Sequence, residues 1–131
     1  MTIYQHGALF CAGGCGYTGL ELLWRGRSHW SMFLAGGTGF LLLGALSGKK
    51  LPLPVKALCA SGSITALELA VGLAVNRDHH VWDYRQMPLN FRGQICLPYS
   101  LLWLPLGLGG MALYQKLLPH CPGGKQKGQL P

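Results

Sequence analysis

Four apolar segments, separated by polar connections, dominate the pattern of residues along the chain. They cover residues about 6–24, 31–48, 53–75 and 95–115. Each is close to the roughly 20 residues that an α-helix needs to cross the hydrocarbon of a bilayer. The pattern therefore predicts an all-α integral membrane protein, a single domain over residues 1–131 built as a four-helix transmembrane bundle. A polar loop at 76–94 and a basic tail at 116–131 complete the chain.

Composition supports the membrane assignment. Of the 131 residues, 50% are hydrophobic and only 11% are charged, whereas soluble domains carry roughly 25% charged residues. The 20 glycines point the same way, because glycine costs about 1 kcal/mol per helical position in water but lets transmembrane helices pack closely. We expect membrane lipids as partners. We also expect a homo-oligomer, since a bundle of this size has little interior volume for a solute path.

Charged residues divide by type between the two ends of the predicted helices. The arginines follow the first and third segments, at Arg25, Arg27, Arg77, Arg85 and Arg92, and the acids lie on or near that side. The lysines lie at the opposite side, at Lys49, Lys50, Lys56, Lys116, Lys125 and Lys127. The numbers are too similar for the positive-inside rule to decide the orientation. We expect the arginines to pair with carboxylates, and the lysine side, together with both termini, to be cytoplasmic.

This charge distribution also bears on partners. The net charge is +7, but the basic residues stand singly between apolar runs and form no stripe or arm. A nucleic-acid backbone is usually bound by such a cluster. We therefore expect no nucleic-acid partner.

Two acids lie inside the predicted spans, Glu21 in the first and Glu68 in the third. An ionisable group in a span is costly unless it faces protein, water or a partner, so both are candidates for function. Arg25, one helical turn after Glu21, is the expected partner of that carboxylate, and the pair can equally be purely structural. Glu68 has no charged residue three or four positions on, so it is the stronger functional candidate.

The two acids stand in similar phrases, TGLEL at residues 18–22 and TALEL at residues 65–69. Two spans separate the copies, so both would run in the same direction across the membrane, as in parallel repeats. This predicts a finer arrangement, in which the bundle consists of two parallel two-helix repeats. It would bring the two carboxylates toward one axis beneath the loop at 76–94.

Residues 82–103, WDYRQMPLNFRGQICLPYSLLW, form a polar, aromatic passage that runs directly into the fourth apolar segment. Trp82 and Tyr84 carry amphipathic rings, which we expect at the depth of the membrane interface. Around this passage we predict a substrate-binding group made of Glu21, Glu68, Arg77, His80, Trp82, Asp83, Tyr84, Asn90 and Arg92.

The sequence predicts neither a metal nor a cofactor. His79 and His80 lie near acids in the loop, but adjacent histidines lack the HxxxH or HxxE spacing that fixes a metal geometry. The chain contains no GxxxxGK[ST] motif that would cradle the phosphates of a nucleotide.

Three features together resemble a known family. They are Gly16-Tyr17 with Glu21, Leu67-Glu68-Leu69 with Gly72, and the passage at 82–103. With them, most of the chain resembles the ABC-transporter type IV family, also called CmpB-like, a group of small multi-pass membrane proteins. The resemblance implies a permease, and with it a separate ATPase subunit as a partner.

Three functions remain open from the sequence. The first is a permease-type or accessory transport component, with intramembrane carboxylates lining a polar cavity beneath the loop at 76–94. The second is an intramembrane enzyme acting on a lipid or isoprenoid, with Glu21, Glu68 and Asp83 as catalytic acid–base groups. The third is a structural or interaction subunit. A water-filled path would favour transport, whereas carboxylates within hydrogen-bonding reach around a closed pocket would favour the enzyme.

Overall fold

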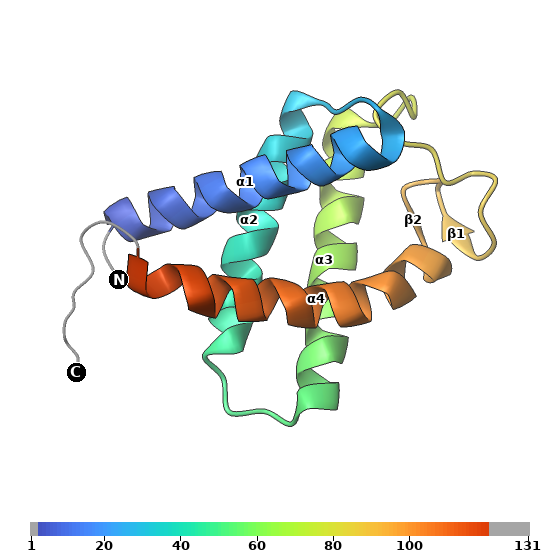
Figure 1. Cartoon of the computed structure of the whole chain (residues 1–131). Helices are drawn as coiled ribbons and strands as arrows, with labels where there is room; N and C mark the ends of the chain where they lie inside the picture. Colours follow the sequence, from blue (N-terminus) through green and yellow to red (C-terminus); the bar gives the residue numbers. More distant parts are fainter. Residues whose placement is uncertain (1–2, 121–131) are drawn as a thin grey trace.

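A computed structural model describes residues 3–120, and within this range four long helices and one small hairpin make up the fold (Figure 1). The elements are α1 (Ile3–Arg25), α2 (Trp30–Ser47), α3 (Leu53–Val75), β1 (Asn90–Phe91), β2 (Ile95–Cys96), α4 (Leu97–Leu117) and a 3-10 turn (Leu118–His120). The prediction of an all-α fold with four helices is confirmed. The predicted tail at 116–131 begins inside α4, and its residues 121–131 lie outside the described range.

The ends of the helices follow from local sequence. α1 ends just before Gly26, whose φ of 75° is the left-handed conformation that glycine adopts without strain, and whose N–H donates to Leu22 O. α2 begins where the His29 ring accepts a hydrogen bond from the Ser31 N–H. α3 and α4 each have a proline in the first turn, where its missing N–H costs nothing.

Three helices are long and apolar enough to cross a membrane: α2, α3, and α4 with its 3-10 extension, Leu97–His120. The first helix is as long as α3, but its polar residues, among them Gln5, His6 and Glu21, leave it outside this group. A span at 6–24 therefore stays a prediction. Many large apolar side chains lie on the outside, such as Leu23 at 87% exposed and Trp24 at 76%, which suits a hydrocarbon surrounding.

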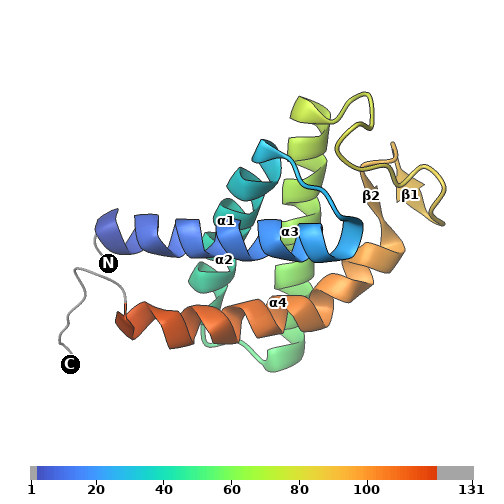
Figure 2. The same ribbon diagram turned by 45° about the horizontal axis from the view of Figure 1, so that its top comes forward.

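The helices form two crossing pairs. α1 and α4 run crosswise to α2 and α3 in two views that differ by 45° (Figures 1 and 2). α1 packs on α2, while α4 packs on both α2 and α3. Because α1 crosses α3 instead of running beside it, these views do not show the parallel repeats predicted from residues 18–22 and 65–69, and the repeats stay a prediction.

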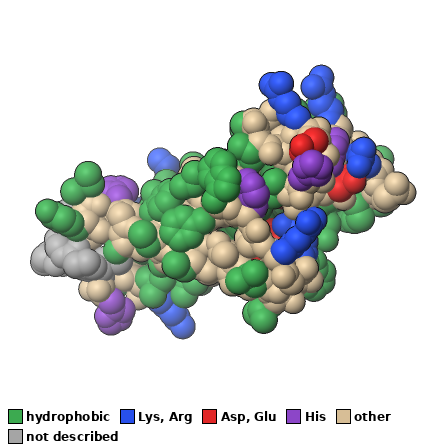
Figure 3. Space-filling view, turned by 90° about the horizontal axis from the view of Figure 1, so that it is seen from above, with side chains coloured by type: hydrophobic (Ala, Val, Ile, Leu, Met, Phe, Trp, Pro, Cys, Tyr) green, Lys and Arg blue, Asp and Glu red, His purple; other side chains and the backbone are tan. Residues whose placement is uncertain are grey.

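Apolar contacts at the crossings form three clusters of buried side chains. One joins Leu43, Ala60, Ile64 and Met111; the second joins Leu9, Phe40 and Tyr114; the third joins Met32, Val81 and Trp82. The third cluster is the one that fixes the site, because it packs the loop that follows α3 against the start of α2. Viewed from above, the visible acidic side chains and many of the basic ones lie toward one end of the molecule, histidines appear at both ends, and much of the face between is apolar (Figure 3).

Candidate functional site

The loop at 76–94 is built around one buried side chain, Asn76, the residue that ends α3. Its amide nitrogen donates to Trp82 O at 2.7 Å and to Gln94 Oε1 at 2.9 Å. Its amide oxygen accepts from the N–H groups of Val81 at 2.7 Å and Trp82 at 3.2 Å. Asn76 has no exposed surface, so these bonds replace the water that its amide group would otherwise bind.

Gln94 closes the same network from the other end of the loop. Its side-chain nitrogen donates to Asn76 O at 2.9 Å, and its own carbonyl oxygen accepts from the Trp82 indole N–H at 2.8 Å. Gly72, one turn before Asn76, makes room for it, because a Cβ atom at position 72 would overlap Gln94 Oε1 and press on the Trp82 ring. Gln94 was not among the site residues predicted from the sequence. The indication that the sequence offered for Gln94 is that it is an uncharged polar residue just before the apolar fourth helix.

The outer part of the loop is a short hairpin in which Asn90 pairs with Cys96 and Phe91 with Ile95. Asn90, a predicted binding residue, is exposed, and its side chain serves the turn: Nδ2 donates to Met87 O at 2.9 Å and Oδ1 accepts from the Gly93 N–H at 3.0 Å. These contacts assign Asn90 to the shape of the hairpin.

Beneath the loop lies Glu68, which has two hydrogen-bond donors from elsewhere in the chain. Its Oε2 accepts from the Tyr84 hydroxyl at 3.3 Å, and its Oε1 accepts from Trp103 Nε1 of α4 at 3.2 Å. Tyr84 is itself held by stacking on Tyr99, with ring centroids 4.8 Å apart. Burial, and then the charge of Glu68, raise the pKa of the Tyr84 phenol. The hydroxyl therefore keeps its proton at neutral pH and can donate it to Glu68.

Trp103 was not among the site residues predicted from the sequence either. An indole N–H in an apolar helix needs an acceptor, and the acids of the neighbouring helices are the natural candidates. This requirement indicates that the Trp103 indole has a polar partner, but it does not identify which acid that partner is.

Glu21 forms the second half of this carboxylate cluster. Its carboxylate pairs with Arg25 Nε as predicted from their spacing, and Arg25 Nη1 also donates to Val81 O of the loop at 2.7 Å. Tyr17, one turn before Glu21 on α1, interacts electrostatically with both Glu21 and Glu68. The two glutamates interact with each other. Glu21 and Glu68 are therefore close enough to interact electrostatically, and Tyr17 interacts with both.

Asp83 has its contacts outside this cluster. Its two oxygens accept from Arg85 Nε at 2.9 Å and Nη2 at 2.7 Å, and the Arg85 backbone N–H adds a third bond at 2.9 Å. These hydrogen bonds hold the pKa of the Asp83 carboxyl below its usual range. A catalytic role for Glu21, Glu68 and Asp83 together stays a prediction, and the contacts of Asp83 join it to Arg85, not to the two glutamates.

The remaining loop residues have separate surroundings. Trp82 is only 6% exposed and packs inside the protein, whereas the His80 ring pairs with Asp78 on the surface. His79 Nε2 hydrogen bonds to Arg92 O at 2.9 Å. Among residues 3–120, no group of three His, Cys, Asp or Glu side chains is placed to hold a metal ion.

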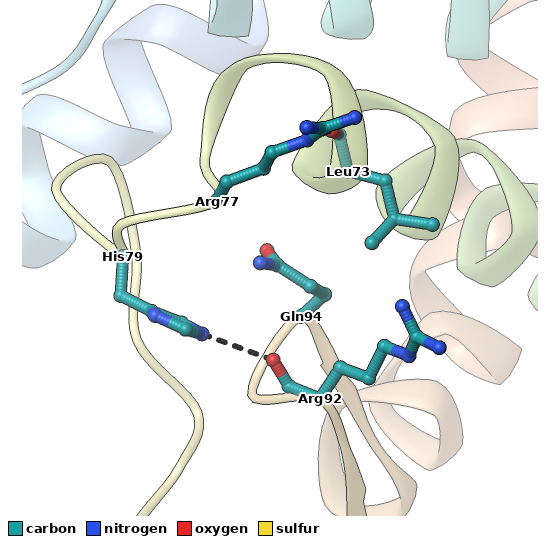
Figure 4. A pocket seen from close by; sticks show the side chains of 5 residues that line it. All are labelled: Leu73, Arg77, His79, Arg92 and Gln94. Atoms are coloured by element: carbon teal, nitrogen blue, oxygen red, sulfur yellow. Dashed lines mark hydrogen bonds between the residues drawn. The ribbon is translucent and has the colours of Figure 1, made fainter.

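Arg77 and Arg92 border an open pocket of about 540 Å³ on the outer side of the loop, which His79, Gln94 and Leu73 also line (Figure 4). Neither guanidinium forms an ion pair with a carboxylate of the described residues. Among the described residues, the expectation that the arginines pair with carboxylates is therefore correct for Arg25 and Arg85 and wrong for Arg27, Arg77 and Arg92. The physical reason is that the acids of this region are already paired with nearer partners.

A sequence model of the family described as "Putative ABC-transporter type IV" matches residues 28–123, which cover α2, α3, the loop and α4. The chain belongs to this ABC-transporter type IV family. The resemblance stated from the sequence is thereby confirmed. All of α1 lies outside the match, and with it Tyr17, Glu21 and Arg25. No curated protein and no solved structure matches the chain.

Proposed function

We propose that this type IV family protein is a small permease-type or accessory component of a membrane transporter, in which Glu68 exchanges a proton beneath the loop at 76–94. The observation that carries the proposal is the setting of Glu68. It lies on an apolar helix long enough to span a membrane, yet it is bonded to Tyr84 of the loop. Ionisable groups at such positions commonly belong to solute or proton pathways.

The two donors of Glu68 differ in what they can do. The Trp103 indole N–H can only donate, whereas the Tyr84 hydroxyl can donate or accept. When Glu68 becomes protonated, the proton can therefore lie on Oε2, because the Tyr84 hydroxyl can rotate and accept a hydrogen bond from it. This reversal changes the bond that ties the loop to α3, and so couples the charge of Glu68 to the position of the loop. Tyr17 extends the group toward Glu21.

Other members of the assembly belong to the proposal as well. The chain has no nucleotide-binding GxxxxGK[ST] motif, so a transporter driven by ATP would need a separate ATPase subunit. A homo-oligomer would supply the interior volume that one copy of four helices lacks. A cytoplasmic position of both termini is part of the same proposal.

A structural role is the second candidate, and a specific observation favours it. Both oxygens of Glu68 have donors and Glu21 has Arg25, so the cluster is paired as a purely structural network would be. The lipid-enzyme alternative has less support, because Asp83, its proposed second acid–base group, is occupied by Arg85.

Proton flux into reconstituted vesicles tests the proposal. The full chain is placed in vesicles that contain a pH-sensitive dye, and a potassium gradient with valinomycin supplies the driving potential. We expect proton uptake above that of empty vesicles, and its loss in Glu68→Gln, which keeps the size and hydrogen bonding of the side chain but removes its titration.

A matched control lies one turn earlier on the same helix. Thr65→Val removes the hydrogen bond of Thr65 Oγ1 to Ser100 on α4, 2.8 Å long, and leaves the carboxylates untouched. This variant should keep the flux. Equal flux in the wild type and Glu68→Gln would contradict the proposal. Wild-type flux no greater than in empty vesicles, together with failure of Glu68→Gln to accumulate, would support the structural role instead.

A further inference from the structure

We propose that the pocket bordered by Arg77, His79 and Arg92 binds a phosphate group, such as that of an anionic lipid headgroup at the membrane surface. This site is separate from the proposed proton pathway. It lies on the outer side of the buried Asn76–Gln94 network, while Glu68 lies beneath the loop.

The two guanidinium groups come from different parts of the chain, and each is held by a contact within the protein. Arg77 follows α3, and its Nε donates to Leu73 O at 2.7 Å, which leaves the two Nη nitrogens for a ligand. Arg92 lies in the hairpin turn, and its guanidinium carbon sits 5.6 Å from the centre of the Phe91 ring, a cation–π contact. Figure 4 shows both side chains at the rim of the same space, with Gln94 between them.

The backbone also holds the rim in an uncommon shape. His79 and Arg92 have φ values of 62° and 55°, which lie in the left-handed region that residues other than glycine rarely adopt. The bond from His79 Nε2 to Arg92 O, 2.9 Å long, joins these two residues directly. Strained backbone of this kind occurs at ligand sites, where it sets the rim before the ligand arrives.

The chemistry of the lining selects an anion with several oxygens. The pocket walls are Leu73, Arg77, His79, Arg92 and Gln94, which include no carboxylate. Asp83, an acid that interacts electrostatically with His79, is already paired with Arg85. Two guanidinium forks with free N–H groups fit phosphate oxygens better than a single point charge does, and a volume of about 540 Å³ accommodates a headgroup.

The position of the pocket favours a lipid as the source of the phosphate. It sits at the end of α3, a helix apolar enough to span a membrane, and Leu73 of that helix forms one wall. A phosphate at this level would lie where headgroups lie, with its glycerol end against Leu73. A free phosphate ion would use the same guanidinium groups, so the experiment must separate the two sources.

The test uses the full chain in neutral dodecyl maltoside micelles and measures its thermal unfolding midpoint, because a ligand that binds the folded state raises it. The probes are phosphatidylglycerol, phosphatidylcholine and inorganic phosphate, each titrated separately. We expect phosphatidylglycerol to raise the midpoint more than phosphatidylcholine does. In Arg77→Gln/Arg92→Gln, the concentration for half of that shift should rise at least tenfold.

Two further variants keep the outcome decisive. Arg27→Gln removes the same charge from an exposed arginine in the α1–α2 connection and should leave the response unchanged. Arg77→Lys/Arg92→Lys keeps the charge but loses the planar forks, and should fall between wild type and the glutamine variant. If the glutamine variant does not fold, the lysine variant still tests whether the guanidinium groups contribute to binding.

The possible results separate as follows. A response to phosphatidylglycerol alone supports a lipid site, and a response to inorganic phosphate that needs both arginines supports a phosphate site of free ions. No response to either probe overturns the proposal. An equal loss in Arg27→Gln also overturns it, because the effect would then be general charge attraction.

Discussion

Asn76 and Asn90 stand near opposite ends of one loop and use the same amide group for the same purpose, yet in different surroundings. Both donate to backbone carbonyls and accept backbone N–H groups within the loop. Asn76 is completely buried against α3, and its partners include the side chain of Gln94. Asn90 is exposed at the turn of the hairpin.

The contrast between the two asparagines identifies the polar groups that hold the loop in place. If Asn90 is lost, water can replace its amide group at the surface. If the Asn76 side chain is lost, the Val81 and Trp82 N–H groups and Gln94 Oε1 are left without a partner where water does not reach. A buried polar group without a partner costs about 1–3 kcal/mol. The inner side of the loop should therefore be far more sensitive to substitution than the outer side.

The largest expected effect comes from Asn76→Ala compared with Asn90→Ala. The first should lower the free energy of unfolding by about 3 kcal/mol or more, since several buried groups lose their partners together. The second should cost about 1 kcal/mol or less. Unfolding by sodium dodecyl sulfate in mixed micelles, followed by tryptophan fluorescence, measures both. Equal losses for the two asparagines would mean that water reaches Asn76.

A smaller effect is expected from Gly72→Ala, which tests the same network through its neighbour. The added Cβ atom would overlap Gln94 Oε1, and Gln94 cannot move freely because Asn76 holds both ends of its amide. Overpacking of this kind costs about 1–3 kcal/mol. Gly62→Ala on the same helix is the matched control, because its Cβ meets no atom within 4 Å. It should be neutral or stabilise by up to about 1 kcal/mol. The same unfolding assay applies, and matching costs for the two variants would argue against a rigid Gln94.

The smallest effect concerns the outer ion pair of Asp83 and Arg85. The Arg85 hydrogen bonds lower the pKa of Asp83 in the folded protein, so any stability from the pair is present above the unfolded pKa of about 4. It is lost only as the pH falls further, through the folded pKa. The difference in unfolding midpoint between wild type and Asp83→Asn should thus stay constant from pH 7 to pH 5. It should shrink below about pH 4. A difference that already disappears at pH 5 would show that Arg85 does not hold Asp83 in solution.

Much of the fold could be predicted because it depends on local sequence. The apolar runs place the four helices within a few residues of their observed ends, and the pairing of Glu21 with Arg25 follows from one helical turn. The crossing of α1 and α4 over α2 and α3 could not be predicted. The length and hydropathy of a helix specify that it can span a membrane but do not specify the angle at which it meets its neighbours.

The site was less predictable because its contacts are distant along the chain. Glu68 looked unpartnered when only its own helix was considered, but Tyr84 is 16 residues away and Trp103 is 35 residues away. Asp83 had been grouped with the two glutamates because all three lie near one end of the predicted helices. Its neighbour two residues on, Arg85, was a nearer partner, and a short loop satisfies such local pairs first.

The bond from Arg25 to Val81 O has a consequence for the order in which the protein assembles. Its two residues are 56 positions apart, so at a synthesis rate of roughly 5–20 residues per second, about 3–11 s pass between their appearance. Arg25 can pair with Glu21 as soon as α1 forms, whereas the loop must be made and folded before Val81 O is in place. The guanidinium of Arg25 thus joins a segment that is synthesised early to one that is synthesised later. Its second hydrogen bond can form only after the loop has docked.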